Sequence, residues 1–195
     1  MLVRFLKLGP RHYGVLVERK SGPWVILEPA PGYDDFLPHD LLHFVAEAEF
    51  GLDGAIFGQL AAGGDPGLFV PVDGRLRGKW LRSRKLRKKE RPRGRRSEAL
   101  AATLDAAWRA RTGRAPLPEY WDVVLAEARV EPDRLAVVLA SVDDLAKRWH
   151  KLQIGGSLTL EWPRPEGRRQ HHQAAKGRSA TGPTARRVRG HRLPS

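Results

Sequence analysis

Two histidines four residues apart, His39 and His43, lie in the segment PHDLLHFVAEAEF, and Glu47 follows one turn later. Residues four apart share a face of an α-helix, so two imidazole nitrogens at this spacing can reach one ion about 2 Å away. A carboxylate one turn later can complete the ligand set, orient a histidine, or act as a base on a water molecule bound to the ion. The spacing therefore predicts a site for zinc or another divalent metal on His39, His43 and Glu47.

The helix that must position these residues is expected to run from about Phe36 to Phe50. At 100° per residue the three ligands fall within about 80° of arc, opposite a core stripe. The core stripe consists of Leu37, Leu41, Phe44, Val45 and Ala48. Asp40 lies about 100° from His39, so we expect it to support a ligand rather than bind the ion. Glu47 and Asp40 are thus the candidate catalytic residues if the protein is an enzyme.

A second interpretation of this helix needs no metal. Phe36, Ala46 and Phe50 share the side that carries the histidines, so that side is mixed rather than charged throughout. Such a face could line a pocket, or it could simply bury two histidines, with His39 capping the helix and His43 packing on an aromatic ring. Asp40 also stands where zinc peptidases of the H-E-x-x-H type carry glutamate, which argues against peptidase chemistry.

The stretch HDLLH…GQLA resembles the H-D-x-x-H…G-E-L-A zinc-site signature of the ubiquinone-biosynthesis protein family. The matching positions are His39, Asp40, His43, Gly58 and Gln59. The resemblance covers about 25 residues and implies a metal site on a largely helical fold, linked to processing of a quinone head-group precursor. Gln59 replaces the family's glutamate, a position for which Glu47 or Glu49 could compensate. The region from PGYDDFLPHD to GQLAAGGD is also similar to a group of uncharacterised actinobacterial proteins, which implies no activity.

The charge of the chain is concentrated in two segments. The net charge is +13, yet residues 75–96 hold 13 Lys or Arg and one Glu, and residues 163–195 hold nine and one. The rest of the chain is therefore acidic. Segregated positive charge suggests contact with nucleic acid, the ribosome or another polyanion. The alternative function is thus a non-catalytic nucleic-acid-binding protein that acts through these two basic arms.

The first basic segment interleaves cations with an aromatic ring, a pattern that can hold nucleic-acid phosphates while a base stacks. Its candidate contacts are Arg77, Lys79, Trp80, Arg82, Arg84, Lys85, Arg87, Lys88 and Lys89. Two other interpretations remain open for this segment. It could be a solvated linker whose arginines reflect a GC-rich bacterial genome, or it could lie on an anionic membrane surface.

The hydrophobic pattern predicts an α+β fold. Strands are expected over 2–8, 12–19 and 23–28 as an antiparallel ribbon, and over 157–162 as a C-terminal strand that could pair with it. Four to six helices should pack on this sheet, among them one capped by Ser97 and two short pieces within 131–152. We expect one domain over 1–162, interrupted by the basic segment 75–96, and a disordered basic tail over 163–195.

Two absences in the sequence limit the chemistry and the expected location. The chain contains no cysteine, so disulfides and thiolate chemistry are excluded. The first residues do not form a signal peptide, and no apolar run is long enough to span a bilayer. The expected location is therefore the cytoplasm.

Overall fold

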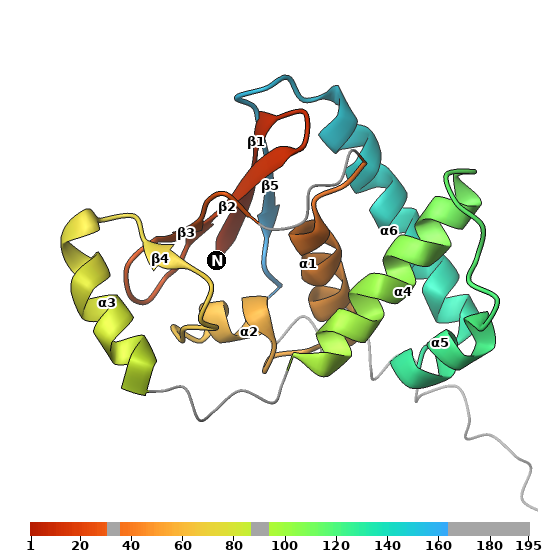
Figure 1. The fold of residues 1–195 in the computed structure, drawn as a ribbon, viewed down its shortest axis with the longest axis horizontal. Helices are drawn as coiled ribbons and strands as arrows, with labels where there is room; N and C mark the ends of the chain where they lie inside the picture. The colour runs from red at the N-terminus through yellow and green to blue at the C-terminus, as the bar shows by residue number, and fades with distance from the viewer. Residues whose placement is uncertain (31–35, 87–93, 164–195) are drawn as a thin grey trace, which may run out of the picture. The chain divides into compact units, whose positions relative to one another are not determined.

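A five-stranded antiparallel sheet organises the fold, with its strands in the order β4-β3-β2-β1-β5. The structure is a computed structural model and describes residues 1–30, 36–86 and 94–163 (Figure 1). The strands are β1 (Leu2–Gly9), β2 (His12–Glu18), β3 (Val25–Leu27), β4 (Val70–Pro71) and β5 (Ser157–Glu161). The predicted pairing of the C-terminal strand with the ribbon is confirmed, since β5 pairs with β1 from Leu2↔Glu161 to Leu6↔Ser157.

Six helices accompany the sheet within the described residues, which confirms the α+β class. They are α1 (His39–Phe50), α2 (Ile56–Ala61), α3 (Gly74–Leu86), α4 (Arg95–Arg111), α5 (Trp121–Ala128) and α6 (Pro132–Lys151). Residues Met1–Trp162 form one compact unit. None of the helices in the described part of the chain is long and apolar enough to cross a bilayer.

Some predictions fall outside the described residues. These are the disorder of the tail from residue 164 onward and the nucleic-acid contacts of Arg87, Lys88 and Lys89. The side chains of Arg84 and Lys85 are likewise not described, although their backbone belongs to α3.

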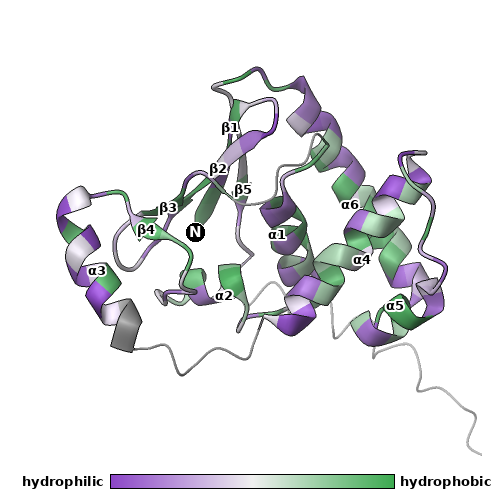
Figure 2. Ribbon diagram, in the orientation of Figure 1, coloured by the Kyte–Doolittle hydropathy of each residue, from purple (hydrophilic) through white to green (hydrophobic). Residues whose placement is uncertain are grey.

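Helix α1 lies between the sheet and two other helices, and this placement decides which way its side chains point. Its Phe44 ring packs edge-on against Phe5 of β1, with 6.1 Å between ring centroids, and lies 5.5 Å from Trp162. The other sides of α1 pack on α4 and α6. Hydrophobic and hydrophilic residues therefore alternate along α1 in Figure 2, because it buries an apolar face on the sheet and a polar face on α4.

The boundaries of α1 and α6 differ from the predictions, for identifiable reasons. Helix α1 begins at His39 rather than at Phe36, because Pro38 adopts an extended conformation (φ −57°, ψ 127°) and disfavours helical geometry at Leu37 before it. The two helical pieces expected within 131–152 are one helix, α6. The buried residues of α6 recur every three or four positions on both sides of Ser141, so one apolar face runs along the helix without a break.

Candidate metal centre

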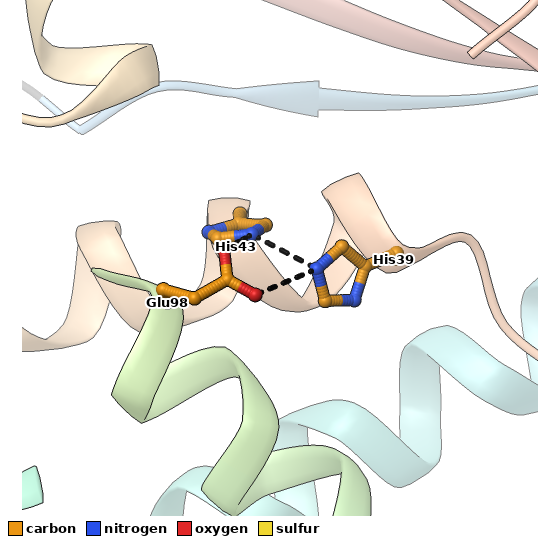
Figure 3. A group of neighbouring side chains, drawn as sticks. All are labelled: His39, His43 and Glu98. Atoms are coloured by element: carbon orange, nitrogen blue, oxygen red, sulfur yellow. Dashed lines mark hydrogen bonds and ion pairs between the residues drawn. The ribbon is translucent and has the colours of Figure 1, made fainter. Parts of the chain in front are cut away.

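His39, His43 and Glu98 bring three ligand groups together where α1 passes the first turn of α4 (Figure 3). The Nε2 atoms of the two histidines are 3.1 Å apart. Glu98 places Oε1 3.5 Å from His39 Nε2 and Oε2 3.2 Å from His43 Nε2. A tetrahedral ion with ligands about 2.0–2.2 Å away holds neighbouring ligand atoms roughly 3.3–3.6 Å apart. These distances use both oxygens of Glu98. With one ligand atom from each residue, the atoms lie within 4.8 Å of one another, so the three residues lie close enough to hold a metal.

The group is open to solvent on one side and closed on the other. The side chain of His43 is 5% exposed, whereas those of His39 and Glu98 are 38% and 64% exposed. An ion held by these three residues would leave its open side to water or another small ligand.

A buried chain of hydrogen bonds holds His43 from behind. The Ser97 hydroxyl donates to Glu47 Oε1 at 2.7 Å and lies 2.7 Å from His43 Nδ1. With Glu47 ionised, the single proton of Ser97 is used on this carboxylate, so Ser97 accepts the N–H of His43 Nδ1. A neutral imidazole that carries its proton on Nδ1 has an unprotonated Nε2. The nitrogen that faces His39 and Glu98 is therefore the one with a lone pair, as metal ligation requires.

Glu47 is fixed by backbone groups as well as by Ser97. Its Oε1 accepts the N–H of Ile56 at 3.1 Å, and its Oε2 accepts the N–H of Phe57 at 2.7 Å. These donors belong to the first turn of α2, where backbone N–H groups have no partner within the helix. Burial raises the pKa of Glu47 to about 7, while the bonds from Ser97 and the backbone act in the opposite direction.

The electrostatics of the group favour a neutral His43. The pKa of His43 is lowered to about 4, chiefly by burial and also by the neighbouring His39, against the attraction of Glu98. A neutral, Nδ1-protonated His43 turns a lone pair toward the Glu98 carboxylate 3.2 Å away. Two such electron pairs repel unless positive charge lies near them, and either a proton on His39 Nε2, 3.1 Å from His43 Nε2, or a metal ion supplies it.

The order of these groups excludes a serine-hydrolase triad. In such a triad the histidine lies between the serine and the carboxylate and takes the proton of an accessible hydroxyl. Here Ser97 lies between His43 and Glu47, and the residue is fully buried. Its hydroxyl is therefore a structural link and not a nucleophile.

Asp40 lies apart from the group, as the helical angles predict. Its Oδ2 accepts the hydroxyl proton of Tyr13 from β2 at 2.8 Å, and its own N–H lies 3.4 Å from the same hydroxyl oxygen. Burial raises the pKa of Asp40, partly offset by the Tyr13 bond. Asp40 thus ties the first turn of α1 to the sheet.

The structure brings together two of the three predicted ligands. His39 and His43 meet as expected, but the third member of the group is Glu98, and the oxygens of Glu47 point to Ser97 and α2. Glu47 is fully buried and Asp40 is 4% exposed, so neither can touch a substrate in this structure. No local signal links Glu98 to a helix more than fifty residues earlier, and only the packing of α4 on α1 reveals it.

Other residues singled out in the sequence lie away from this centre. Gln59, which matches the family's glutamate position, donates to the carbonyl of Gly54 at 2.8 Å. His150, a histidine of α6, also lies outside the group, with its Nε2 2.7 Å from the carbonyl oxygen of Phe36. Of the predicted nucleic-acid contacts, Arg77, Lys79 and Arg82 are exposed on α3, whereas Trp80 is half-buried.

Comparison with known proteins finds no match among protein-family models, curated proteins or solved structures. The functional assignment therefore rests on the residues and geometry of this chain.

Proposed function

We propose that this protein binds a divalent first-row metal ion through His39, His43 and Glu98, and that zinc is the natural occupant. The observation that carries the proposal is the mutual approach of three ligand groups at 3.1–3.5 Å, two of them on one helix and one on its neighbour. Two imidazoles and one carboxylate are a common ligand set for catalytic zinc, and they also suit iron(II).

The surroundings support a metal site over a pair of ordinary buried histidines. A structural histidine needs only a satisfied N–H, which Ser97 already provides to His43. It does not need a second imidazole and a carboxylate directed at its other nitrogen. The Glu47–Ser97–His43 chain resembles the carboxylate–histidine contacts that orient ligands in zinc proteins, with a hydroxyl inserted between the two.

The open side of the centre indicates the kind of chemistry. A bound ion would supply Lewis acidity to a water molecule or to a substrate oxygen. His39 and Glu98 form the exposed rim and would face a small substrate, while Glu47 and Ser97 keep His43 in place. From the ubiquinone-biosynthesis resemblance we carry over only a metal site on the two histidines, because Asp40 and Gln59 lie outside the group.

Metal analysis of the purified, untagged full chain tests the proposal. Wild-type protein should contain close to one equivalent of metal per chain, and His39→Ala, His43→Ala and Glu98→Gln should each lower that content at least tenfold. A matched control, His171→Ala/His172→Ala, removes two histidines of the tail and should leave the content unchanged. Folded wild-type protein that takes up no zinc or iron(II) on reconstitution would refute the proposal, as would metal lost only with the tail histidines.

A further inference from the structure

Helix α3 presents a surface of one charge. Its 13 residues, GRLRGKWLRSRKL, contain no acidic residue. We define the basic surface of α3 as Arg75, Arg77, Lys79 and Arg82, all of which are exposed. In the described part of the chain, no ion pair joins any of the four to a carboxylate. Their charge is therefore available to a partner.

This helix is anchored, so its cations are held in place relative to the sheet. The indole N–H of Trp80 donates to the carbonyl of Phe69 at 3.1 Å, and Arg77 Nε donates to the carbonyl of Pro71 at 3.3 Å. The Arg19 guanidinium lies 5.3 Å from the centroid of the Trp80 ring. Fixed charges lose less entropy on binding a polyanion than the same charges on a free segment would.

A cavity opens beside the basic surface. It has a volume of about 180 Å³ and is lined by Pro23, Asp65, Leu76, Lys79, Trp80 and Ser83. An aromatic ring and apolar side chains supply contact for a flat ring, and the polar groups can accept or donate hydrogen bonds. The nearby Arg19 is 6% exposed, and its Nη2 has no hydrogen-bond partner among the described residues. Its guanidinium interacts electrostatically with Asp65, the carboxylate that lines the same cavity.

We propose that the basic surface of α3 and this cavity bind single-stranded nucleic acid, independently of the metal centre. The cations contact backbone phosphates, and an unpaired base enters the cavity beside Trp80. A base held in a duplex cannot leave its stack without cost, so the cavity selects single strands.

The distribution of apolar residues argues against a membrane surface as the partner. A helix that lies on a bilayer needs a continuous apolar face opposite its charged face. On α3 the exposed leucines, Leu76 and Leu81, are 39% and 44% exposed and lie about 140° apart around the helix axis, with cations between them. Purple, hydrophilic residues recur along α3 in Figure 2, and no uninterrupted green face accompanies them.

Fluorescence anisotropy with a labelled 12-nucleotide oligouridine tests the proposal on the full chain. The key variant is Arg75→Gln/Lys79→Gln/Arg82→Gln. Its matched control is Lys147→Gln/Arg148→Gln/Lys151→Gln, which removes the same charge from exposed positions on α6. The α3 variant should bind at least tenfold more weakly at 50 mM salt. The slope of log affinity against log salt should be smaller in magnitude by about two for the α3 variant. The variant lacks three cations, and each phosphate contact contributes about 0.7 to this slope for single strands.

Two further measurements test the cavity and the alternative partner. Leu76→Phe, which fills the cavity from a partly exposed position, should weaken oligouridine binding at least threefold while circular dichroism shows an unchanged fold. Duplex RNA of the same length should bind more weakly than the single strand. Equal losses in the α3 and α6 variants would overturn the proposal, as would equal affinity for the duplex. Binding to vesicles rich in phosphatidylserine without binding to oligouridine would also overturn it, in favour of a membrane partner.

Discussion

The Ser97 hydroxyl lies 2.7 Å from His43 Nδ1 and connects residues that are 54 positions apart in the chain. Through Ser97, the imidazole is linked to Glu47, and through Glu47 to the first backbone N–H groups of α2. Three helices thereby fix one ring. The consequence is chemical as well as structural, because the chain of bonds determines which nitrogen of His43 carries its proton.

The first prediction concerns Ser97→Ala. This change removes the acceptor for His43 Nδ1–H and the donor to Glu47, so the ring loses both its orientation and its preferred tautomer. We expect zinc affinity to fall by roughly 10- to 100-fold, as for other groups that orient metal ligands. Competition with a chromophoric chelator measures the affinity, and urea unfolding of the metal-free protein should show a loss of about 1–3 kcal/mol.

Thr103→Val provides the matched control for Ser97→Ala. Thr103 is a second buried hydroxyl of α4, and it donates only within its own helix, to the carbonyl of Ala99 at 2.7 Å. Its loss should lower stability but leave zinc affinity unchanged. Similar losses of affinity in both variants would mean that a weakened α4, and not the link to His43, is the cause.

The difference between Glu98 and Glu47 shows what the sequence can and cannot predict about this centre. Helical periodicity relates residues on one helix, so His39 and His43 could be paired from their spacing alone. The same periodicity places Glu47 on their side of α1 but cannot show what that side meets. In the structure it meets the first turn of α2, whose backbone N–H groups capture the carboxylate. Glu98 comes from a separate helix, and its position depends on packing that no local pattern encodes.

Helix α4 illustrates the same limit for a predicted cap. Ser97 is followed by a glutamate and a run of apolar residues, a pattern that predicts a helix capped by Ser97. The helix starts at Arg95, after Gly94, and Ser97 lies within its first turn. The local sequence is compatible with Ser97 at the N-cap or in the first turn of α4. The partners of its hydroxyl, however, belong to α1 and cannot be predicted from that sequence. By contrast, the alternation of apolar residues in β1 and β2 was sufficient to predict the ribbon, because strand burial follows a period of two.

The second prediction concerns Glu47 and the pH dependence of stability in the metal-free protein. Burial raises the pKa of this carboxyl from its ordinary value of 4.5 to about 7. The folded state therefore binds more protons than the unfolded state between these values, so this group makes the protein less stable as the pH rises from about 4.5 to about 7. Urea unfolding across pH 5 to 8 in the presence of a chelator should reveal the effect.

Glu47→Gln isolates this contribution because glutamine does not titrate. The advantage in unfolding free energy of the wild type over the variant should shrink with rising pH, by at most about 3 kcal/mol. An advantage that grows with pH instead would show that the hydrogen bonds from Ser97, Ile56 and Phe57 outweigh burial and lower the pKa of Glu47.

The third prediction concerns His43, whose effect has the opposite sign. Burial lowers its pKa to about 4, so the unfolded chain binds more protons than the folded chain below about pH 6.5. This group therefore destabilises the fold as the pH falls from 6.5 toward 4. A nuclear magnetic resonance titration of the metal-free protein should give His43 a midpoint near pH 4, with the resonance assigned by its loss in His43→Gln. A midpoint above pH 6 would show that burial does not keep the His43 ring neutral in the metal-free protein.

The fourth prediction separates Asp40 from the metal centre. Tyr13→Phe removes the hydroxyl that donates to Asp40 Oδ2, in a place where the carboxyl is buried. We expect a loss of about 1–3 kcal/mol in unfolding free energy, because the buried carboxyl loses a hydrogen bond that water cannot readily replace.

The pKa of Asp40 should rise further in Tyr13→Phe, since the Tyr13 bond lowers it in the wild type. Zinc affinity should change less than about threefold, since the Tyr13 hydroxyl contacts Asp40 and the backbone of His39 but neither imidazole ring. The double variant Tyr13→Phe/Asp40→Asn serves as the control in a mutant cycle, and its cost should be smaller than the sum of the two single costs. If zinc affinity instead fell as far as in Ser97→Ala, Asp40 would support the metal centre, as its angle of about 100° to His39 on the helix predicts.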